Sequence, residues 1–361
     1  MLKTHNTLHS HYYTSESIFR EELERVVYKR WLCVGREEQI QNPGDYFVQN
    51  ISDESLIINR DRSGAVNAFY NICRHRGTRL CANEGGHFRE TIQCPYHAWT
   101  YSLDGRLIGA PNMNDTAGFD KRDYPLHNAC IETWQGFLFV NLDPEPEPLS
   151  LAFAPLDGKF DRWDIAGLRT ARRINYDAQA NWKLLTENYS ECYHCPLVHP
   201  ALAKLSPYDS GDNDLSSGPY LGGYMLINED SLTMTGDTHR PPLGQVSGDD
   251  LHRVYYYSLF PNMLLSLHPD YVMFHTLWPQ SPGRTLITCE WLFDPQTMAR
   301  SDFNPNDAVE FWDMTNQQDW HICEEAQIGM KSRVYRPGPL HSIQEVLPVA
   351  FDREVLKALG H

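Results

Sequence analysis

Apolar and polar positions along the chain predict three regions of different texture. In residues 15–33 the apolar side chains recur at close to helical spacing behind a serine that can cap the first turn, which predicts an amphipathic helix. From Gly44 onwards the chain consists of short β-like runs separated by turn signals. Helical signals at 180–195 and 306–332 then occur among longer strand-like runs. The pattern therefore predicts a small all-β unit followed by a larger α+β unit.

A proline-rich stretch supplies the main domain boundary. Residues 143–148 (DPEPEP) alternate proline with acidic residues and contain no apolar side chain, as in an extended linker. We expect an N-terminal helical segment at 1–40 that packs on the last domain, an all-β domain at 41–148 and an α+β domain at 149–361. Residues 206–250, rich in Gly, Ser, Asp and Pro, are expected to form a long loop over a site.

Composition narrows the classes of function. The 361 residues carry 31 Lys and Arg against 47 Asp and Glu, and a net charge of −16 disfavours binding to nucleic acid or anionic membranes. We expect no membrane span, because no apolar run reaches the required length, and no signal peptide. Nine cysteines in such a chain predict reduced cytoplasmic thiols rather than a disulfide framework. Together with 16 histidines, they are candidate metal ligands.

Two half-motifs in the all-β region each contribute one cysteine and one histidine. Cys73 and His75 form C-x-H, and Cys94 and His97 form C-x2-H after 18 intervening residues. Zinc fingers pair cysteines in one half and histidines in the other, whereas one of each suits a Rieske [2Fe–2S] cluster, in which one iron takes both thiolates and the other both imidazoles. A zinc site and four unrelated buried residues remain alternatives. Cys81 is expected to be a packed thiol.

A second candidate site lies in the stretch NWKLLTENYSECYHCPLVH, which contains Glu191, His194 and His199. Glu191 and His194 are three residues apart and would share one helix face. His199 would point about 140° away from His194 in an unbroken helix, but Pro196 interrupts the helix and lets His199 turn back. Two histidines and one carboxylate would make the facial triad of non-haem Fe(II), with positions open for O₂.

The carboxylate of that triad has two candidates. Asp319 falls in the apolar stripe of the helix-like stretch 306–332, where an unpaired carboxylate is costly and needs a metal or a cation. A structural salt bridge would also explain Asp319. Glu191 is the other candidate ligand, and it could instead orient His194 or connect it to another redox centre. Asn188, in the same stretch as Glu191, is a further candidate catalytic residue.

The second half of the chain is rich in aromatic residues that could line a pocket. Aromatic faces could surround a quaternary ammonium or an aromatic ring, and for most of these side chains a place in the core is the default expectation. His268 and His275, in strand-like runs, are expected to be structural rather than metal ligands. The aromatic candidates are Tyr220, Tyr224, Tyr255, Tyr257, Phe260, Tyr271, Phe274 and Trp278.

With these motifs the chain closely resembles the α subunit of Rieske non-haem iron oxygenases, a family of aromatic-ring-hydroxylating dioxygenases and demethylating monooxygenases. The strongest stretches are CRHRGTRLC, CPYHAWTYSLDGRL and NWKLLTENYSECYHCPLVHP, in the family's order. The resemblance implies an α+β fold class, with an all-β Rieske [2Fe–2S] domain followed by a helix-grip (START-like) catalytic domain built on an antiparallel sheet. It implies that the cluster is held by Cys73, His75, Cys94 and His97, and the mononuclear iron by His194, His199 and Asp319.

The resemblance also implies an assembly and partners. Glu191 occupies the place of the acid that links a cluster histidine, here His97, to the iron ligand His194, and electrons cross between neighbouring chains of a ring. A homotrimer α3, or an α3β3 assembly, is therefore implied. A separate flavin and iron–sulfur reductase, directly or through a ferredoxin, would deliver electrons from NAD(P)H, with O₂ as co-substrate. The expected location is the cytoplasm.

The sequence around Glu191 bears on the substrate. Many ring dioxygenases have Asp at this place, whereas Glu191 within ECYHC is more similar to glycine betaine and related quaternary-amine oxygenases. We expect monooxygenation of a small organic substrate, leading to oxidative N-demethylation of a quaternary amine. The alternatives are an aromatic-ring-hydroxylating dioxygenase, a Rieske electron-transfer protein whose second domain binds a ligand, and a helix-grip binding module with decayed metal sites.

Overall fold

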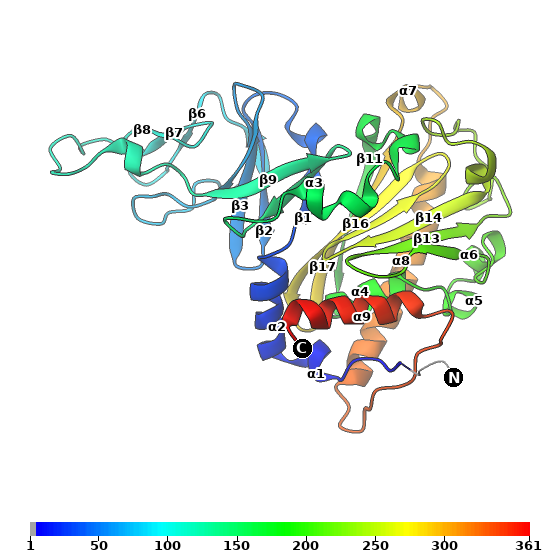
Figure 1. The fold of residues 1–361 in the computed structure, drawn as a ribbon. Coiled ribbons are helices and arrows are strands. Elements are labelled where there is room, and N and C mark those ends of the chain that lie inside the picture. The colour runs from blue at the N-terminus through cyan, green and yellow to red at the C-terminus, as the bar shows by residue number, and fades with distance from the viewer. Residues whose placement is uncertain (1–4) are drawn as a thin grey trace. The chain divides into compact units, whose positions relative to one another are not determined.

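The computed structural model describes residues 5–361 and divides into two compact units, each described by itself (Figure 1). The β unit is Tyr28–Leu149, and the α+β unit is Ser150–His361 together with the segment up to Val27. The β unit thus begins at Tyr28, where the sequence pattern placed its start at residue 41. The expected helix at 15–33 consists of α2 (Glu16–Glu22) and a π-helical turn (Leu23–Val27), preceded by the short α1 (His11–Thr14).

Strand pairing explains why that helix is shorter than its apolar pattern predicts. Leu32–Arg36 forms strand β1, all five residues of which are buried, paired antiparallel with β10 (Phe137–Asn141). A sheet more than 100 residues away in sequence therefore determines the conformation of this segment. The local periodicity of residues 15–33 could not reveal this long-range strand pairing.

The β unit contains two antiparallel sheets. The larger has the strand order β1-β10-β9-β4-β3-β2-β5, and the smaller has the order β6-β7-β8. Their remaining strands are β2 (Asp45–Ile51), β3 (Glu54–Arg60), β4 (Val66–Tyr70), β5 (Gly85–His87), β6 (Thr91–Gln93), β7 (Thr100–Ser102), β8 (Leu107–Gly109) and β9 (Asn128–Trp134).

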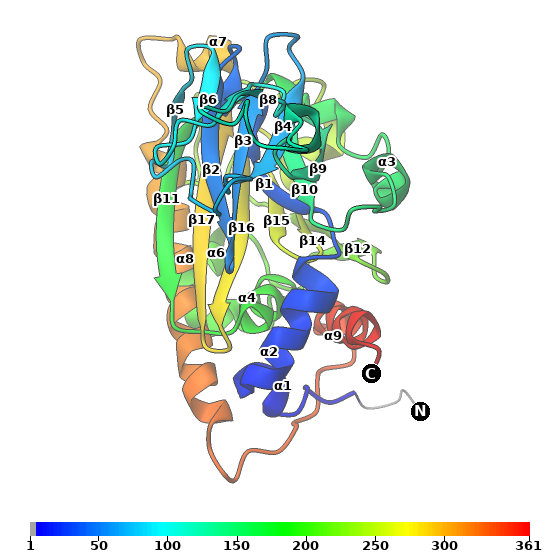
Figure 2. The same cartoon turned by 90° about the vertical axis from the view of Figure 1, so that its left-hand side faces the viewer.

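The α+β unit is built on one antiparallel sheet, in the order β11-β17-β16-β15-β14-β13-β12. Figures 1 and 2 show the long helix α8 (Asn306–Met330) running beside its strands, with α4 (Trp182–Tyr189) and α9 (Val346–Leu359) near one end. The strands are β11 (Arg169–Ala178), β12 (Asp212–Leu215), β13 (Tyr220–Leu226), β14 (Arg253–Leu259), β15 (Met263–Leu267), β16 (Val272–Ser281) and β17 (Arg284–Phe293).

Packing of α8 on the sheet forms one buried cluster of this core. Phe311 and Trp312 of α8 are buried with Tyr271 and Trp291 of the sheet region, and burial of each such aromatic side chain stabilises the fold by roughly 2–3 kcal/mol. Four short helices complete the fold: α3 (Leu149–Ala152), α5 (Cys195–Val198), α6 (Pro200–Leu205) and α7 (Pro295–Met298). No helix in residues 5–361 is long and apolar enough to cross a membrane.

The segment 206–250, expected to be a loop, contains two strands instead. Its glycines are the reason, because Gly222 and Gly223 lie so close to neighbouring strand backbone that a Cβ atom would collide with it. Residues that look like loop formers in sequence thus allow β13 to pair on both sides, with β12 and with β14. The irregular part of the segment follows β13.

Buried charges join the N-terminal segment to α4 and α9. Lys183 Nζ lies 2.5 Å from Glu22 Oε1, and the Tyr13 hydroxyl donates to Glu187 Oε1 at 2.7 Å. Burial raises the pKa of Asp352, on α9, to about 7, and it also raises the pKa of Glu187 well above its usual range. Asp352 is therefore protonated in the folded protein over a pH range where the unfolded chain has it ionised.

We expect the contribution of Asp352 to stability to fall as pH rises from about 4 to about 7, because its carboxyl group in the folded state retains a proton that it has lost in the unfolded state. Asp352→Asn mimics the protonated form, so this variant should be more stable than the parent by roughly 2–4 kcal/mol at pH 7.5 and nearly equal to it at pH 4. Tm measured across this range checks the prediction, with the exposed Asp157→Asn as control. A constant difference in Tm across the range would contradict it.

Candidate metal centres

Two loops of identical backbone geometry carry the four residues of the first candidate site. In each loop the cysteine N–H donates to the carbonyl of the residue five positions later, at 2.8 Å for both Cys73 and Cys94. The cysteine carbonyl accepts from the residue four positions later, at 3.0 and 3.1 Å respectively. That fourth residue, Gly77 or Ala98, has a positive φ of 71° or 56°. The chain therefore makes the same ligand-presenting turn twice.

The four side chains divide into an inner and an outer pair. Cys73 and Cys94 are buried, and burial raises the pKa of the Cys94 thiol. The rings of His75 and His97 are exposed, with centroids 4.8 Å apart, and His75 stacks on Trp99. An arrangement with both sulfurs inside and both imidazoles outside fits a cluster whose inner iron takes thiolates and whose outer iron takes histidines.

Spacing of the ligand atoms separates a cluster from a zinc ion. Four ligands of one Zn²⁺ would bring their atoms within about 4 Å of one another, given bond lengths of about 2.0–2.3 Å. Among the described residues, the group of ligand side chains close enough together to hold a single ion is His194, His199 and Asp319, and the Cys and His set does not form such a group. A binuclear cluster, whose two irons spread the ligands apart, fits these loops better than a single ion.

The second candidate site begins where α4 ends. The sequence pattern extended this helix to residue 195, whereas α4 ends at Tyr189, so Glu191 and His194 lie in the following turn rather than on a helix face. They meet nevertheless, with Glu191 Oε1 2.5 Å from His194 Nδ1. The short helices α5 and α6 each have a proline in the first turn, where a missing N–H is tolerated, and His199 occupies the bend between them.

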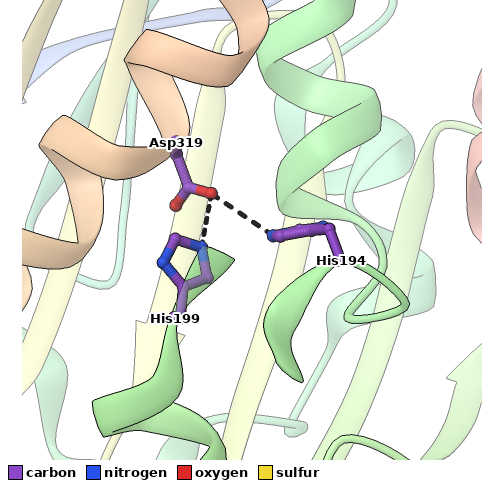
Figure 3. A group of neighbouring side chains, drawn as sticks. All are labelled: His194, His199 and Asp319. Carbon is purple, nitrogen blue, oxygen red and sulfur yellow. Dashed lines mark hydrogen bonds and ion pairs between the residues drawn. The ribbon is translucent and has the colours of Figure 1, made fainter. Parts of the chain in front are cut away.

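Asp319, on α8, completes a group of three with the two histidines (Figure 3). One carboxylate oxygen, Oδ1, lies 2.7 Å from His199 Nε2 and 3.3 Å from His194 Nε2. The three ligand atoms lie within 4.8 Å of one another. Two imidazoles and one carboxylate converging from one side, with other directions open, match the donor set of a non-haem Fe(II) site.

The electrostatics of this group favour a cation at its centre. Burial lowers the pKa of His194, but the hydrogen bonds that its ring donates to Asp319 and Glu191 outweigh burial and raise the pKa to about 10. For Asp319, burial raises the pKa, and the two histidines reverse this and lower it. Two carboxylates facing two imidazoles thus stabilise positive charge between them, whether a proton or a metal ion supplies it.

Further side chains hold the histidine rings. Glu191 contacts Nδ1 of His194, on the side of the ring away from Asp319, so the geometry places Asp319 rather than Glu191 among the converging ligand atoms. Asn188 Nδ2 lies 3.4 Å from His194 Nε2. Gln318 Oε1 lies 2.7 Å from His199 Nδ1. Gln318 was not predicted from the sequence, although an amide directly before the candidate ligand Asp319 was a visible signal.

A disulfide closes the turn between Glu191 and His199. Cys192 and Cys195 are bonded, with Cα atoms 5.0 Å apart, so the prediction of reduced thiols was wrong for this pair. The other seven cysteines form no disulfide among the described residues. The number of cysteines and the redox compartment bear on disulfides between distant residues. They do not reveal a disulfide between two cysteines that a local turn brings together.

The group of three lines a cavity of about 750 Å³. Of the eight aromatic residues singled out from the sequence, only Tyr224 lines this cavity. Most of the others are buried in the core, which was the default expectation for them. The cavity-lining aromatic residues that were not singled out from the sequence are Tyr189, Tyr208, Tyr256, Trp312 and Trp320. Those on α4 and α8 lie within a few residues of the candidate ligands, which was the available signal.

The two histidines expected to be structural differ in position. His268 is fully buried and stacks on Tyr271. His275 lines the cavity, bonded through Nε2 to Asn316 Oδ1 at 3.2 Å, and burial lowers its pKa to about 4. His275 is therefore neutral at physiological pH and stays outside the converging group of ligand atoms.

An all-β unit with a thiolate and imidazole cluster site, joined to an α+β unit with a mononuclear iron site, defines the class of Rieske non-haem iron oxygenases. Two family models match the chain accordingly: the Rieske [2Fe-2S] domain over residues 30–125 and the ring hydroxylating alpha subunit (catalytic domain) over residues 165–361. The second covers more than half of the chain. The chain therefore belongs to the ring-hydroxylating α subunit family.

Relatives of known activity cover nearly the whole chain. It is 31% identical to the glycine betaine monooxygenase oxygenase subunit of Pseudomonas aeruginosa, over 92% of this chain and 84% of the relative. It is 30% identical to the carnitine monooxygenase oxygenase subunit of Escherichia coli, over 91% of this chain and 86% of the relative.

Solved structures of Rieske oxygenases resemble this chain in fold. The quaternary ammonium Rieske monooxygenase CntA in complex with L-carnitine superposes with a TM-score of 0.83 at 25% identity, covering 98% of this chain and 95% of that one. Naphthalene 1,2-dioxygenase from Rhodococcus, at 20% identity and a TM-score of 0.78, shares the fold. The family, the fold class and the enzyme class predicted from the sequence are confirmed. The chain is the oxygenase component of a system with a Rieske cluster, a non-haem iron, a reductase partner and a small organic substrate.

Proposed function

We propose that this oxygenase component monooxygenates a quaternary amine at an N-methyl carbon, so that the hydroxylated methyl group leaves as formaldehyde. The observation that carries this proposal is the charge of the cavity wall. Besides Glu191 and Asp319, which face the two histidines, the described residues that line it include the carboxylates Asp209 and Asp212, and Arg353 is the single Arg or Lys among them. An acidic cavity with aromatic walls favours a permanent cation over a neutral ring.

We assign each metal site to the residues whose geometry fits it. Cys73, His75, Cys94 and His97 would hold the cluster, and His194, His199 and Asp319 would hold the iron. When bound, the cluster supplies single electrons and the iron activates O₂ for insertion into a C–H bond. Tyr189, Asn188 and the other residues of the cavity wall position the substrate and exclude water.

We propose that Glu191 connects the two centres between neighbouring copies of a homotrimer, with α3β3 as the alternative assembly. Both cluster histidines expose their rings, which allows contact with another copy. Glu191 binds His194 Nδ1 through Oε1 while its Oε2 accepts from the Tyr193 N–H, and its lone pairs leave room for His97 of a neighbouring copy. We place the system in the cytoplasm, where NAD(P)H supplies the flavin and iron–sulfur reductase, directly or through a ferredoxin.

The aromatic wall is held rigidly enough to serve as a cation site. The Trp312 indole N–H donates to the Tyr271 hydroxyl at 2.7 Å, and its ring lies edge-on to Tyr256 with centroids 6.2 Å apart. Tyr189 in turn lies 6.0 Å from Tyr256 and bonds Ser266 through its hydroxyl. Side chains fixed in this way lose little conformational entropy when a quaternary ammonium contacts their faces.

Trp312→Leu should raise the KM for a quaternary amine by roughly 3–30-fold, because it removes an aromatic face worth roughly 0.5–2 kcal/mol to a cation. Trp312→Phe retains an aromatic ring and should change KM less. Steady-state formaldehyde release checks both variants, with a melting curve for each to verify folding. Equal KM values in Trp312→Leu and the parent would show that this ring is not part of the cation site.

A substrate panel tests the proposed reaction itself. Substrate-triggered NADH consumption, with a cognate reductase, should accompany equimolar formaldehyde release from glycine betaine, carnitine, γ-butyrobetaine or choline. Naphthalene or a similar aromatic should yield no cis-diol. Formation of cis-diols without formaldehyde from any quaternary amine would overturn the proposal and leave an aromatic-ring-hydroxylating dioxygenase in its place.

A further inference from the structure

Gln318 occupies a special position beside the candidate iron site. It directly precedes Asp319 on α8, and its Oε1 lies 2.7 Å from Nδ1 of His199. Consecutive helical residues are about 100° apart, so the two side chains reach the same ring from different sides. Gln318 faces Nδ1, and Asp319 Oδ1 faces Nε2 at 2.7 Å. One rigid helix thus contacts both nitrogens of His199.

The side-chain amide of Gln318 determines which ring nitrogen of His199 carries a proton. An amide oxygen only accepts, so a hydrogen bond to Gln318 Oε1 requires that Nδ1 carry the proton. With Nδ1–H held by Gln318, the nitrogen left for a metal is Nε2, which is directed at Asp319 Oδ1 and the candidate metal position and would give up to the metal the place of the proton it shares with Asp319. The side chain of His199 is only 2% exposed, so water does not readily replace Gln318 as the acceptor.

The two histidines are therefore held differently. His194 Nδ1 meets a carboxylate, Glu191, whereas His199 Nδ1 meets a neutral amide. We propose that Gln318 is a positioning residue, which sets the tautomer and ring orientation of His199 so that Nε2 is available to Fe(II) without adding a third carboxylate to the site. The inference rests on the proposed iron-binding role of His199.

Fe(II) binding measured without turnover tests this inference. The full chain, with its cluster intact and its mononuclear site emptied by a chelator, is dialysed anaerobically against graded Fe(II), and bound iron is counted. Gln318→Leu should weaken Fe(II) binding by roughly 10–100-fold, the usual cost of removing a partner that orients a metal ligand. Gln318→Glu, which restores an acceptor for Nδ1, should bind within a few-fold of the parent.

The neighbouring Gln317 provides the matched control. It is exposed and bonds Asp313 Oδ2 at 2.9 Å, so Gln317→Leu removes the same atoms without touching His199. Cluster absorbance should be identical in all variants. If Gln318→Leu does not fold, Gln318→Asn takes its place. Its shorter side chain withdraws the oxygen by one methylene, and it should weaken Fe(II) binding in the same way. Fe(II) binding by Gln318→Leu equal to that of Gln317→Leu would overturn the inference, whereas a parent protein that binds no Fe(II) would overturn the proposed iron site itself.

Discussion

Replacing His199 by alanine is expected to abolish oxygenation while leaving the cluster fully reducible. His199 Nε2 is one of three ligand atoms within 4.8 Å of one another, and its loss leaves only two for the ion. Activation of O₂ requires the metal, whose contribution of several kcal/mol to the transition state corresponds to roughly a thousandfold or more in rate. Formaldehyde release under saturating reductase measures the loss.

Iron content separates this effect from misfolding. The purified His199→Ala variant should retain the cluster absorbance and its two cluster irons but lose the additional iron of the parent protein. His341→Ala, which changes an exposed histidine of the same cavity wall outside the group of three, is the matched control and should retain that iron. Turnover of His199→Ala at the parental rate would mean that the α+β unit only binds a ligand and that the protein is an electron carrier.

Glu191→Gln is expected to uncouple the two centres without emptying either. The amide keeps an acceptor for His194 Nδ1, so iron should remain bound, but it removes the negative charge that faces the imidazole at 2.5 Å. Turnover should fall by roughly 10–100-fold. Because Glu191 is proposed to act after the cluster on the electron path, reduction of the cluster by the reductase should proceed at the parental rate.

Single-turnover kinetics locate that defect. With substrate and O₂ present, the reduced cluster of Glu191→Gln should be reoxidised more slowly than that of the parent by the same factor as turnover falls. Glu325→Gln neutralises an exposed carboxylate on α8 and serves as the control. Reoxidation of the Glu191→Gln cluster at the parental rate would show that Glu191 is not on the electron path. Loss of iron from this variant would show instead that Glu191 orients the iron ligand His194.

Much of the candidate chemistry was readable from the sequence because the ligand residues are close together in it. Cys73 to His97 and Glu191 to His199 each lie within 25 residues, so spacing and turn residues predicted both groups before any fold was known. Short β-like runs separated by turn signals predicted the strands of the β unit for the same reason, whereas the antiparallel sheet of the α+β unit was implied by the family resemblance. The pattern failed at Leu32–Arg36, where a strand forms because β10 supplies a distant partner.

The sequence by itself thus determined the family, the fold class and the two sets of candidate ligands, since each depends on residue types at short spacing. The residue pattern left Asp319 and Glu191 open as the third ligand and the resemblance favoured Asp319, but only the tertiary structure places a carboxylate of Asp319 against both histidines, because it reaches His199 across 120 residues. It also decided which aromatic side chains line the cavity and that Gln318 holds His199. These features arise where α8 packs against the sheet and α4, and long-range packing of that kind leaves no local periodicity in the chain.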